Sequence, residues 1–370
     1  MPLFSFSSLT RLAVLLAVVA CAVAVGVSRL APAPMISRSL RPITTVNIND
    51  YLLRVADRQP RWLDSETGEV KVTPIVADDV LEVASCSPWV DDNGERQMVG
   101  RWSNRTANGT QTVNHAFGLA RYSFPGCRVL DRVTSEVVPV SPPCWFPGTS
   151  ARVLFVAGDG LLYHYAFEGE GQAGDAAAAF ADAAPIPVAW GCPRPGGGEV
   201  HVCDVSWPED PRLGGRLVAS MRTTEVGPGT ERSYSRSRLY WLQLDPAGTK
   251  IVATGPLVDH DANRSSSPNC DERSPTVALL PDGSLGLAFT QLAEGGSSWT
   301  TRLGALRVDA DGRPIAAPSA TARVVAPRSQ AAPLAFSTDG RFLNVLVGDR
   351  DQTDAVARIA TVAAPAGGAN

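Results

Sequence analysis

A strand, a tight turn and a second strand recur along this chain, and this recurrence restricts its fold more than any other feature. The clearest copy runs from Thr276 through the turn Pro281-Asp282-Gly283 to Phe289. A second copy contains the turn Asp339-Gly340. An Asp-Gly pair between two apolar runs is a strong signal for a β-hairpin. Its return after about fifty residues predicts a repeat architecture.

Earlier parts of the chain carry looser versions of the same pattern. Residues 83–138 contain apolar runs for about four strands, and further units open near Ser141 and Cys192. The last unit, from Pro333 to about Val362, has room for only three strands. Four-stranded antiparallel units of roughly fifty residues match the blades of a propeller. We therefore predict an all-β fold, a single β-propeller of five or six four-stranded blades over residues 48–363.

An incomplete last blade indicates how such a ring closes. One end of the chain commonly supplies the strand that the blade at the other end lacks, because this removes an open sheet edge. We expect strands near residues 50–82 to be these donors. Residues 364–370 are expected to form a flexible tail.

The N-terminal region contains an apolar segment, Leu12–Val27, between Arg11 and Arg29. Its length and composition fit an export signal or a membrane anchor within residues 1–30, followed by a Pro-containing linker over 31–47. Cys21 offers a second interpretation, since Val18-Val19-Ala20-Cys21 resembles a bacterial lipobox with a lipid-bearing cysteine. A buried N-terminal helix is the third. The first two predict an extracytoplasmic protein that is secreted, periplasmic or anchored in a membrane by this segment.

Composition and charge exclude some classes of function. Charged residues make up 19% and hydrophobic residues 44% of the chain, with 33 Gly and 29 Pro, which indicates a turn-rich globular protein. The net charge is −4 and no basic stripe is present, so we expect no nucleic-acid partner. The chain also lacks H-E-x-x-H, G-x-S-x-G and P-loop motifs, which argues against the enzymes that carry them.

Six cysteines beyond Cys21 form an even set in a chain with an export signal. Such a set predicts disulfides, although the sequence does not choose among the possible pairings. Free buried thiols are the alternative, and a zinc site is disfavoured because no C-x-x-C occurs. The candidates are Cys86, Cys127, Cys144, Cys192, Cys203 and Cys270.

Two stretches of the chain resemble the repeat of a known family. Pro275–Phe289 and Pro333–Val347 each contain a Pro, an apolar strand, an Asp-Gly turn and a second strand. They resemble the TolB-type (WD40-like) repeat, whose pattern is P-x-x-S-P-D-G-x-x-L-A-F. The resemblance implies a β-propeller of a kind found in many periplasmic or secreted proteins. It implies no catalytic residues, because the repeat is defined by a turn and its strands.

Candidate metal ligands occur in one loop. Asp259, Asp261 and Asn263 have the D-x-D-x-N spacing that can direct alternate oxygens at Ca²⁺. The alternative is a solvated loop between blades, since the stretch lacks the Gly and Glu of an EF-hand. We predict no other cofactor.

Candidate binding residues are aromatic. Trp89, Trp145 and Trp190 stand near the openings of repeat units, where they either pack between blades or stack on a ligand. His164 and His201 alternate with apolar neighbours, so we expect each on the less buried face of its strand. The sequence as a whole favours a non-catalytic binding or scaffold propeller for an unknown protein, peptide or glycan. The alternative is a propeller glycan hydrolase or lyase, which needs acids converging on the central channel.

Overall fold

The computed structural model describes residues of the chain in these ranges: 40–42, 61–64, 66–72, 79–90, 96–108, 111–124, 128–147, 152–167, 184–208, 210–226, 233–259, 270–293, 296, 298–318, 321–329, 335–347 and 356–361. The chain divides into two compact units, Met1–Ile36 and Ser37–Asn370, and every described residue belongs to the second. Its helical segments in these ranges are two 3₁₀ turns, η2 (Pro195–Gly197) and η3 (Pro211–Leu213). No helix within these ranges is long and apolar enough to span a membrane; Leu12–Val27 and Cys21 lie outside them.

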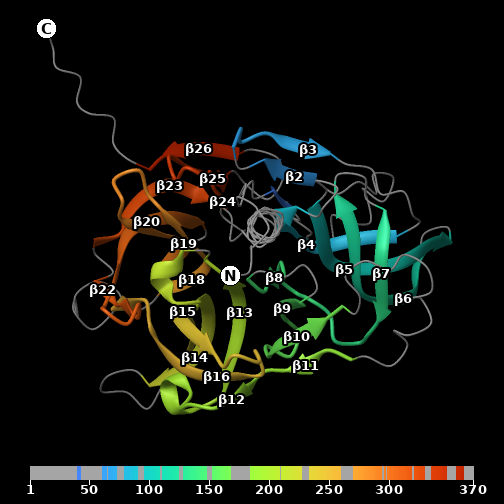
Figure 1. Cartoon of the computed structure of the whole chain (residues 1–370), viewed down its shortest axis with the longest axis horizontal. Coiled ribbons are helices and arrows are strands. Elements are labelled where there is room, and N and C mark those ends of the chain that lie inside the picture. The colour runs from blue at the N-terminus through green and yellow to red at the C-terminus, as the bar shows by residue number, and fades with distance from the viewer. Residues whose placement is uncertain are drawn as a thin grey trace, which may run out of the picture. The chain divides into compact units, whose positions relative to one another are not determined.

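Five sheets of this unit are arranged as the blades of a propeller (Figure 1). The first contains β4 (Asp79–Val90), β5 (Arg96–Asn108), β6 (Gln111–Phe124) and β7 (Val129–Thr134). The second contains β8 (Cys144–Trp145), β9 (Arg152–Val156), β10 (Leu162–Ala166) and β11 (Ile186–Pro187). The third contains β13 (Val200–Ser206), β14 (Leu217–Val226), β15 (Ser233–Leu244) and β16 (Lys250–Pro256), with β12 (Ala189–Trp190) parallel to β16.

The fourth and fifth blades follow the same plan with small additions. The fourth contains β18 (Cys270–Leu279), β19 (Leu285–Ala293) and β20 (Trp299–Val308), and both β21 (Pro314–Ile315) and β23 (Arg323–Ser329) pair with β20. The fifth contains β24 (Ala335–Phe336), β25 (Phe342–Leu346) and β26 (Val356–Ala360). A short parallel pair joins β17 (Val258–Asp259) to β22 (Ala317–Pro318). The predicted all-β propeller is confirmed, with five blades.

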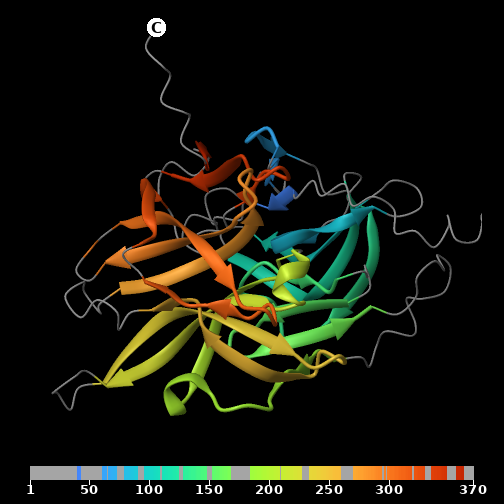
Figure 2. The same ribbon diagram turned by 60° about the vertical axis from the view of Figure 1, so that its left-hand side comes forward.

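Apolar clusters lie between successive blades. Side chains alternate between the two faces of a strand. In β9, Leu154 and Val156 join the cluster shared with the third blade, whereas Val153 and Phe155 join the one shared with the first. All four are fully buried, at 0% exposure. Similar clusters join the third blade to the fourth and the fourth to the fifth. Figure 2 shows the strands of the third blade in yellow beside those of the fourth in orange. Each fully buried side chain of this kind contributes roughly 1.5–3 kcal/mol to folding.

The Asp-Gly turns that recur in the sequence share one local geometry. In the β18–β19 hairpin, Asp282 Oδ1 accepts a hydrogen bond from Ser284 N at 2.9 Å, and Gly283 N donates to the Leu280 carbonyl at 2.9 Å. In the β24–β25 hairpin, Asp339 Oδ1 accepts from Arg341 N at 3.0 Å. Both turn glycines have positive φ, +82° for Gly283 and +68° for Gly340. This left-handed conformation is accessible to glycine at little cost.

The two turns differ in their surroundings. A Cβ on Gly340 would lie 1.9 Å from the carbonyl oxygen of Leu279, the last residue of β18. A Cβ on Gly283 meets no atom within 4 Å. The turn of the fifth blade therefore packs directly on the backbone of the fourth, while the matching turn of the fourth blade is open to solvent.

A further three-stranded sheet contacts the fifth blade. It contains β1 (Leu40–Pro42), which falls within the expected linker, with β2 (Arg61–Asp64) and β3 (Val70–Val72). Figure 1 shows β3 beside β26, where blue meets red. Glu66 Oε1, in the β2–β3 turn, accepts hydrogen bonds from Thr338 N at 2.7 Å and from the Thr338 hydroxyl. Among the described residues no strand pairing joins this sheet to β24–β26, so the expected strand donation is not seen; β2 and β3 pair with each other and present their turn.

His164 of β10 corrects a second expectation. The ring is buried, at 8% exposure, and neither nitrogen has a hydrogen-bond partner. The prediction of a less buried face is wrong here because the second blade is covered on both faces. Burial lowers the pKa of His164, and the positive charge of Arg152 adds to this effect against the opposing charge of Asp245. His201, by contrast, is exposed as expected.

Replacing Gly340 with Ala is expected to destabilise the protein more than replacing Gly283 with Ala. Both substitutions impose a left-handed alanine, at roughly 1–2 kcal/mol. Only Gly340→Ala also forces the Leu279 carbonyl away, so its loss of unfolding free energy should exceed that of Gly283→Ala by at least ~1 kcal/mol. Urea unfolding of the two variants measures this difference. Equal losses would show that the fifth-blade turn does not bear on β18.

Acidification is expected to destabilise the protein through His164. A depressed pKa means that the unfolded imidazole binds its proton first, so stability is full above the unfolded pKa of about 6.5 and declines as the pH falls below it. The slope from one such group is at most about 1.4 kcal/mol per pH unit. Thermal unfolding across this range should show a smaller acid-dependent loss for His164→Leu. A His164→Leu profile parallel to wild type would contradict the assignment.

Candidate ligand-binding site

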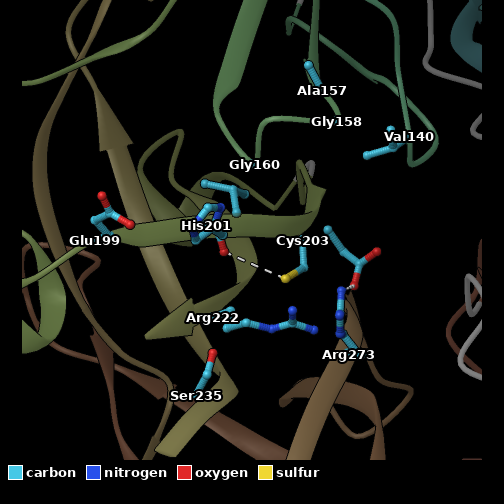
Figure 3. A pocket seen from close by; sticks show the side chains of 12 residues that line it. Val140, Ala157, Gly158, Gly160, Glu199, His201, Cys203, Arg222, Ser235 and Arg273 are labelled. Carbon is cyan, nitrogen blue, oxygen red and sulfur yellow. Dashed lines mark hydrogen bonds and ion pairs between the residues drawn. The ribbon is translucent and has the colours of Figure 1, made fainter. Parts of the chain in front are cut away.

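A pocket of about 490 Å³ lies where the second, third and fourth blades meet (Figure 3). One wall is backbone and small side chains near the β9–β10 turn, including Gly158 and Gly160. The other walls carry polar groups from β13, β14, β15 and β18. Those that matter for its chemistry are His201, Cys203, Asp204, Arg222, Ser235 and Arg273.

The β9–β10 turn packs against β13 and forms one edge of the pocket. Gly160 has φ +76°, and its carbonyl accepts a hydrogen bond from Val202 N at 2.7 Å. A Cβ at Gly160 would lie 2.4 Å from His201 Nδ1. The glycine therefore allows the turn of the second blade to approach the first strand of the third, and His201 lies at this junction in Figure 3.

Cys203 occupies an irregularity in β13. The register with β14 shifts between Val202 and Asp204, so Cys203 is the extra residue of a β-bulge. Its Sγ donates to the His201 carbonyl at 3.6 Å and lies 3.9 Å from Ser237 Oγ. Burial raises the pKa of the Cys203 thiol, outweighing the nearby Arg273. A thiol with a raised pKa stays protonated near neutral pH and is a poor nucleophile.

A second irregularity brings Arg273 to the pocket. The register of β18 shifts between Arg273 and Thr276, and Ser274 has φ +51° although it is not glycine. Its N–H donates to Asp204 Oδ2 at 3.2 Å, and Arg273 Nη1 lies 3.6 Å from the same oxygen. Pro275 has no N–H to lose at this break in the ladder. The strained backbone thus places the Ser274 N–H and the Arg273 guanidinium close to the Asp204 carboxylate.

Asp204 is held in a partly desolvated ion pair. Its side chain is 25% exposed and that of Arg273 is 24% exposed. Burial raises the pKa of Asp204, against the lowering effects of Arg273 and of the Ser274 hydrogen bond. One carboxylate therefore neutralises one guanidinium at this wall of the pocket.

Arg222 of β14 supplies a second guanidinium. Its side chain is exposed and makes no hydrogen bond or ion pair with a residue in the described part of the chain. Figure 3 shows it extending toward Arg273, below Cys203. Glu199, the other acid at the pocket, lies on the far side of His201 from Arg273 in this view. The pocket lining thus contains two guanidinium groups and two carboxylates, and of these only Arg273 and Asp204 form an ion pair among the described residues.

The aromatic candidates do not line this pocket. Trp145 is buried in the cluster between the first two blades, at 5% exposure. Trp190 is partly buried against the cluster between the second and third. Both tryptophans therefore pack between blades. The side chain of Trp89 lies outside the described residues.

The proposed Ca²⁺ loop is only partly described. Asp259 ends β17 and is half-buried, whereas Asp261 and Asn263 lie outside the described residues. No group of three or more His, Cys, Asp or Glu side chains able to hold a metal ion occurs in the described ranges. The Ca²⁺ site stays a prediction.

The cysteines correct the expected disulfide framework. Cys144, Cys192, Cys203 and Cys270 form no disulfide. They lie in different surroundings: Cys144 Sγ donates to the Val205 carbonyl at 3.0 Å, and Cys270 Sγ accepts from Arg238 Nη1 at 3.1 Å. The even count misled because buried thiols also pack as small apolar groups. The side chains of Cys86 and Cys127 lie outside the described residues.

The sequence did not predict the main charged residues of the pocket. Asp204 and Arg273 are separated by 69 positions and carry no motif, and Arg222 reads as an ordinary outward residue of a strand. One local signal was present: Arg273-Ser274-Pro275 interrupts an otherwise regular strand pattern, and a proline inside a strand marks a bulge or an edge.

Comparison with known proteins adds little to this geometry. No family model and no curated protein matches the chain. Among solved structures it is similar to MPT-4, a mannose phosphorylase from Leishmania mexicana in complex with phosphate ion, at 15% identity and a TM-score of 0.36 over 74% of this chain and 82% of that one. It is also similar to the Dos1 propeller, at 10% identity and 0.32 over 74% and 72%. A luciferin-regenerating enzyme matches at 12% identity and 0.27 over 72% and 88%. Similarity this weak identifies no ligand or reaction.

Replacing Ser274 with Gly is expected to stabilise the protein slightly. Relief of the left-handed serine is worth roughly 1–2 kcal/mol, and the greater freedom of glycine in the unfolded chain offsets about 0.4–1 kcal/mol. A net gain of about 0.5 kcal/mol should appear in urea unfolding. Ser274→Ala, which retains the strain, is the control and should show no gain. A loss of stability in Ser274→Gly would mean that the serine conformation carries no strain.

Proposed function

We propose that this protein is a non-catalytic binding propeller that acts outside the cytoplasm and holds a polar group of a protein, peptide or glycan in the pocket between its second, third and fourth blades. The observation that carries the proposal is the pocket itself. It offers charged and polar side chains around a volume of about 490 Å³.

The acids of the pocket favour binding over hydrolysis. A glycoside hydrolase needs two carboxyl groups facing each other across the scissile bond, about 5–10 Å apart. Asp204 is instead engaged by Arg273 and by Ser274 N. Glu199 lies on the other side of His201 from Arg273, the partner of Asp204, in Figure 3.

The thiol of the pocket also favours binding. A Cys–His pair activates its sulfur through contact with the ring. Cys203 contacts the backbone carbonyl of His201, and burial raises its pKa. The protonated thiol supplies a weak donor to a ligand and no nucleophile.

Two finer parts of the proposal rest on sequence. The extracytoplasmic location rests on the apolar segment Leu12–Val27, and the presence of free thiols is compatible with it because exported proteins also contain unpaired cysteines. Kinship with TolB-type repeats is supported by the matching turns at Asp282-Gly283 and Asp339-Gly340, which share hydrogen bonds and glycine conformation.

Binding without turnover is the expected behaviour of the full-length protein. Panels of peptides and glycans can be tested by thermal shift and, in parallel, for release of reducing ends. We expect at least one saturable stabilising ligand whose affinity falls about tenfold or more in Arg273→Ala, because a hydrogen bond to a charged group is worth roughly 1.5–3 kcal/mol.

The matched control is Arg307→Gln, since Arg307 is exposed on β20 and does not line the pocket. This variant should bind like wild type. Glycan cleavage that disappears in Asp204→Asn or Glu199→Gln would overturn the proposal and establish a hydrolase.

A further inference from the structure

We infer that the polar group recognised by this pocket is an oxyanion, a carboxylate, sulfate or phosphate, held between Arg222 and Arg273. The inference rests on the proposed binding function and adds the chemical class of the ligand and the residues that select it.

The positions of Arg222 and Arg273 favour an anionic ligand. In Figure 3 the Arg222 side chain extends toward Arg273, and both side chains line the pocket. Arg273 shares its charge with Asp204, whereas Arg222 has no partner among the residues that the structure describes. Two like charges that face one space repel each other, and an anion placed between them converts this repulsion into two attractions. A neutral or cationic group gains no such energy.

The geometry of the guanidinium donors also favours an oxyanion. A guanidinium is a planar fork that binds an oxyanion through two parallel N–H···O bonds. Arg273 is partly fixed, since Asp204 holds its Nη1 side at 3.6 Å and both side chains are three-quarters buried. Arg222 is exposed and free to adjust. A fixed arm with an adjustable one suits capture of a small anionic group from solvent.

Asp204 is expected to limit the affinity of the pocket for an anion. Its carboxylate competes with the ligand for Arg273, so removal of its charge should strengthen anion binding. The charged or titratable groups around it are Glu199 just before β13, His201 and Cys203 on β13, Arg222 on β14 and Arg273 on β18. Burial raises the pKa of Asp204, so this carboxyl takes up its proton at a higher pH than an ordinary one as the solution is acidified. Anion affinity should therefore rise as the pH falls.

The experiment is isothermal titration of the full-length protein with sodium sulfate at constant ionic strength, kept constant with chloride. Sulfate is chosen because it remains doubly charged as Asp204 titrates. Wild type is expected to bind saturably, and Arg222→Gln to lose about tenfold or more in affinity. Arg307→Gln, with the same change in net charge, should equal wild type. Asp204→Asn should bind several-fold more tightly and lose most of the pH dependence.

Phosphate and acetate titrations then identify the preferred anion. Absence of saturable binding for all three anions, or equal affinities of wild type and Arg222→Gln, overturns the inference. Because Arg222 is exposed, that variant is expected to fold, so the decision does not depend on Asp204→Asn. If neutral glycans or peptides bind while no anion does, the inference fails and the proposed binding function stands. Glycan turnover would instead remove the proposed function.

Discussion

Burial of both faces of each blade is the constraint on which the rest of this structure depends. A single β-sheet cannot shield two apolar faces by itself, and here each sheet meets its neighbours through separate clusters. Val153 and Leu154, adjacent in β9, therefore belong to different cores. The same constraint explains His164: a polar side chain on such a strand has no solvent face, so it is buried without a hydrogen-bond partner and its pKa is lowered.

Hairpin turns supply the contacts that apolar side chains cannot make at the ends of the blades. Gly340 lies against the Leu279 backbone, and Gly160 lies against β13. In both places a positive φ and the absence of a Cβ let one blade approach the backbone of the next. The surroundings differ. Gly160 and the bulge residue Cys203 both line the pocket, whereas Gly340 does not.

The pocket combines local strain with unbalanced charge. Ser274 adopts a left-handed conformation before a proline, where such a backbone is costly, and the result is a directed N–H and a directed guanidinium at Asp204. Strain of this kind persists when the surrounding fold over-determines it, and it is found often at ligand sites. Arg222 has no described partner, so the polar pocket at the edge of this apolar interface includes a guanidinium group without a counter-ion among the described residues.

The sequence by itself determined the secondary structure and the repeat. Alternation of apolar residues and the Asp-Gly turns define hairpins through local sterics, so an all-β propeller followed from residues near one another in the chain. The turn between β18 and β19 was predicted, whereas β18 begins at Cys270, before the predicted start at Thr276. The five-blade arrangement, the absence of a disulfide at Cys144 and Cys270, and the burial of His164 were decided only by the tertiary structure, because each depends on what a neighbouring blade places against a strand. The pocket is of the same kind: Asp204, Arg222 and Arg273 carry no joint pattern in sequence, and only the stacking of blades brings their charges together.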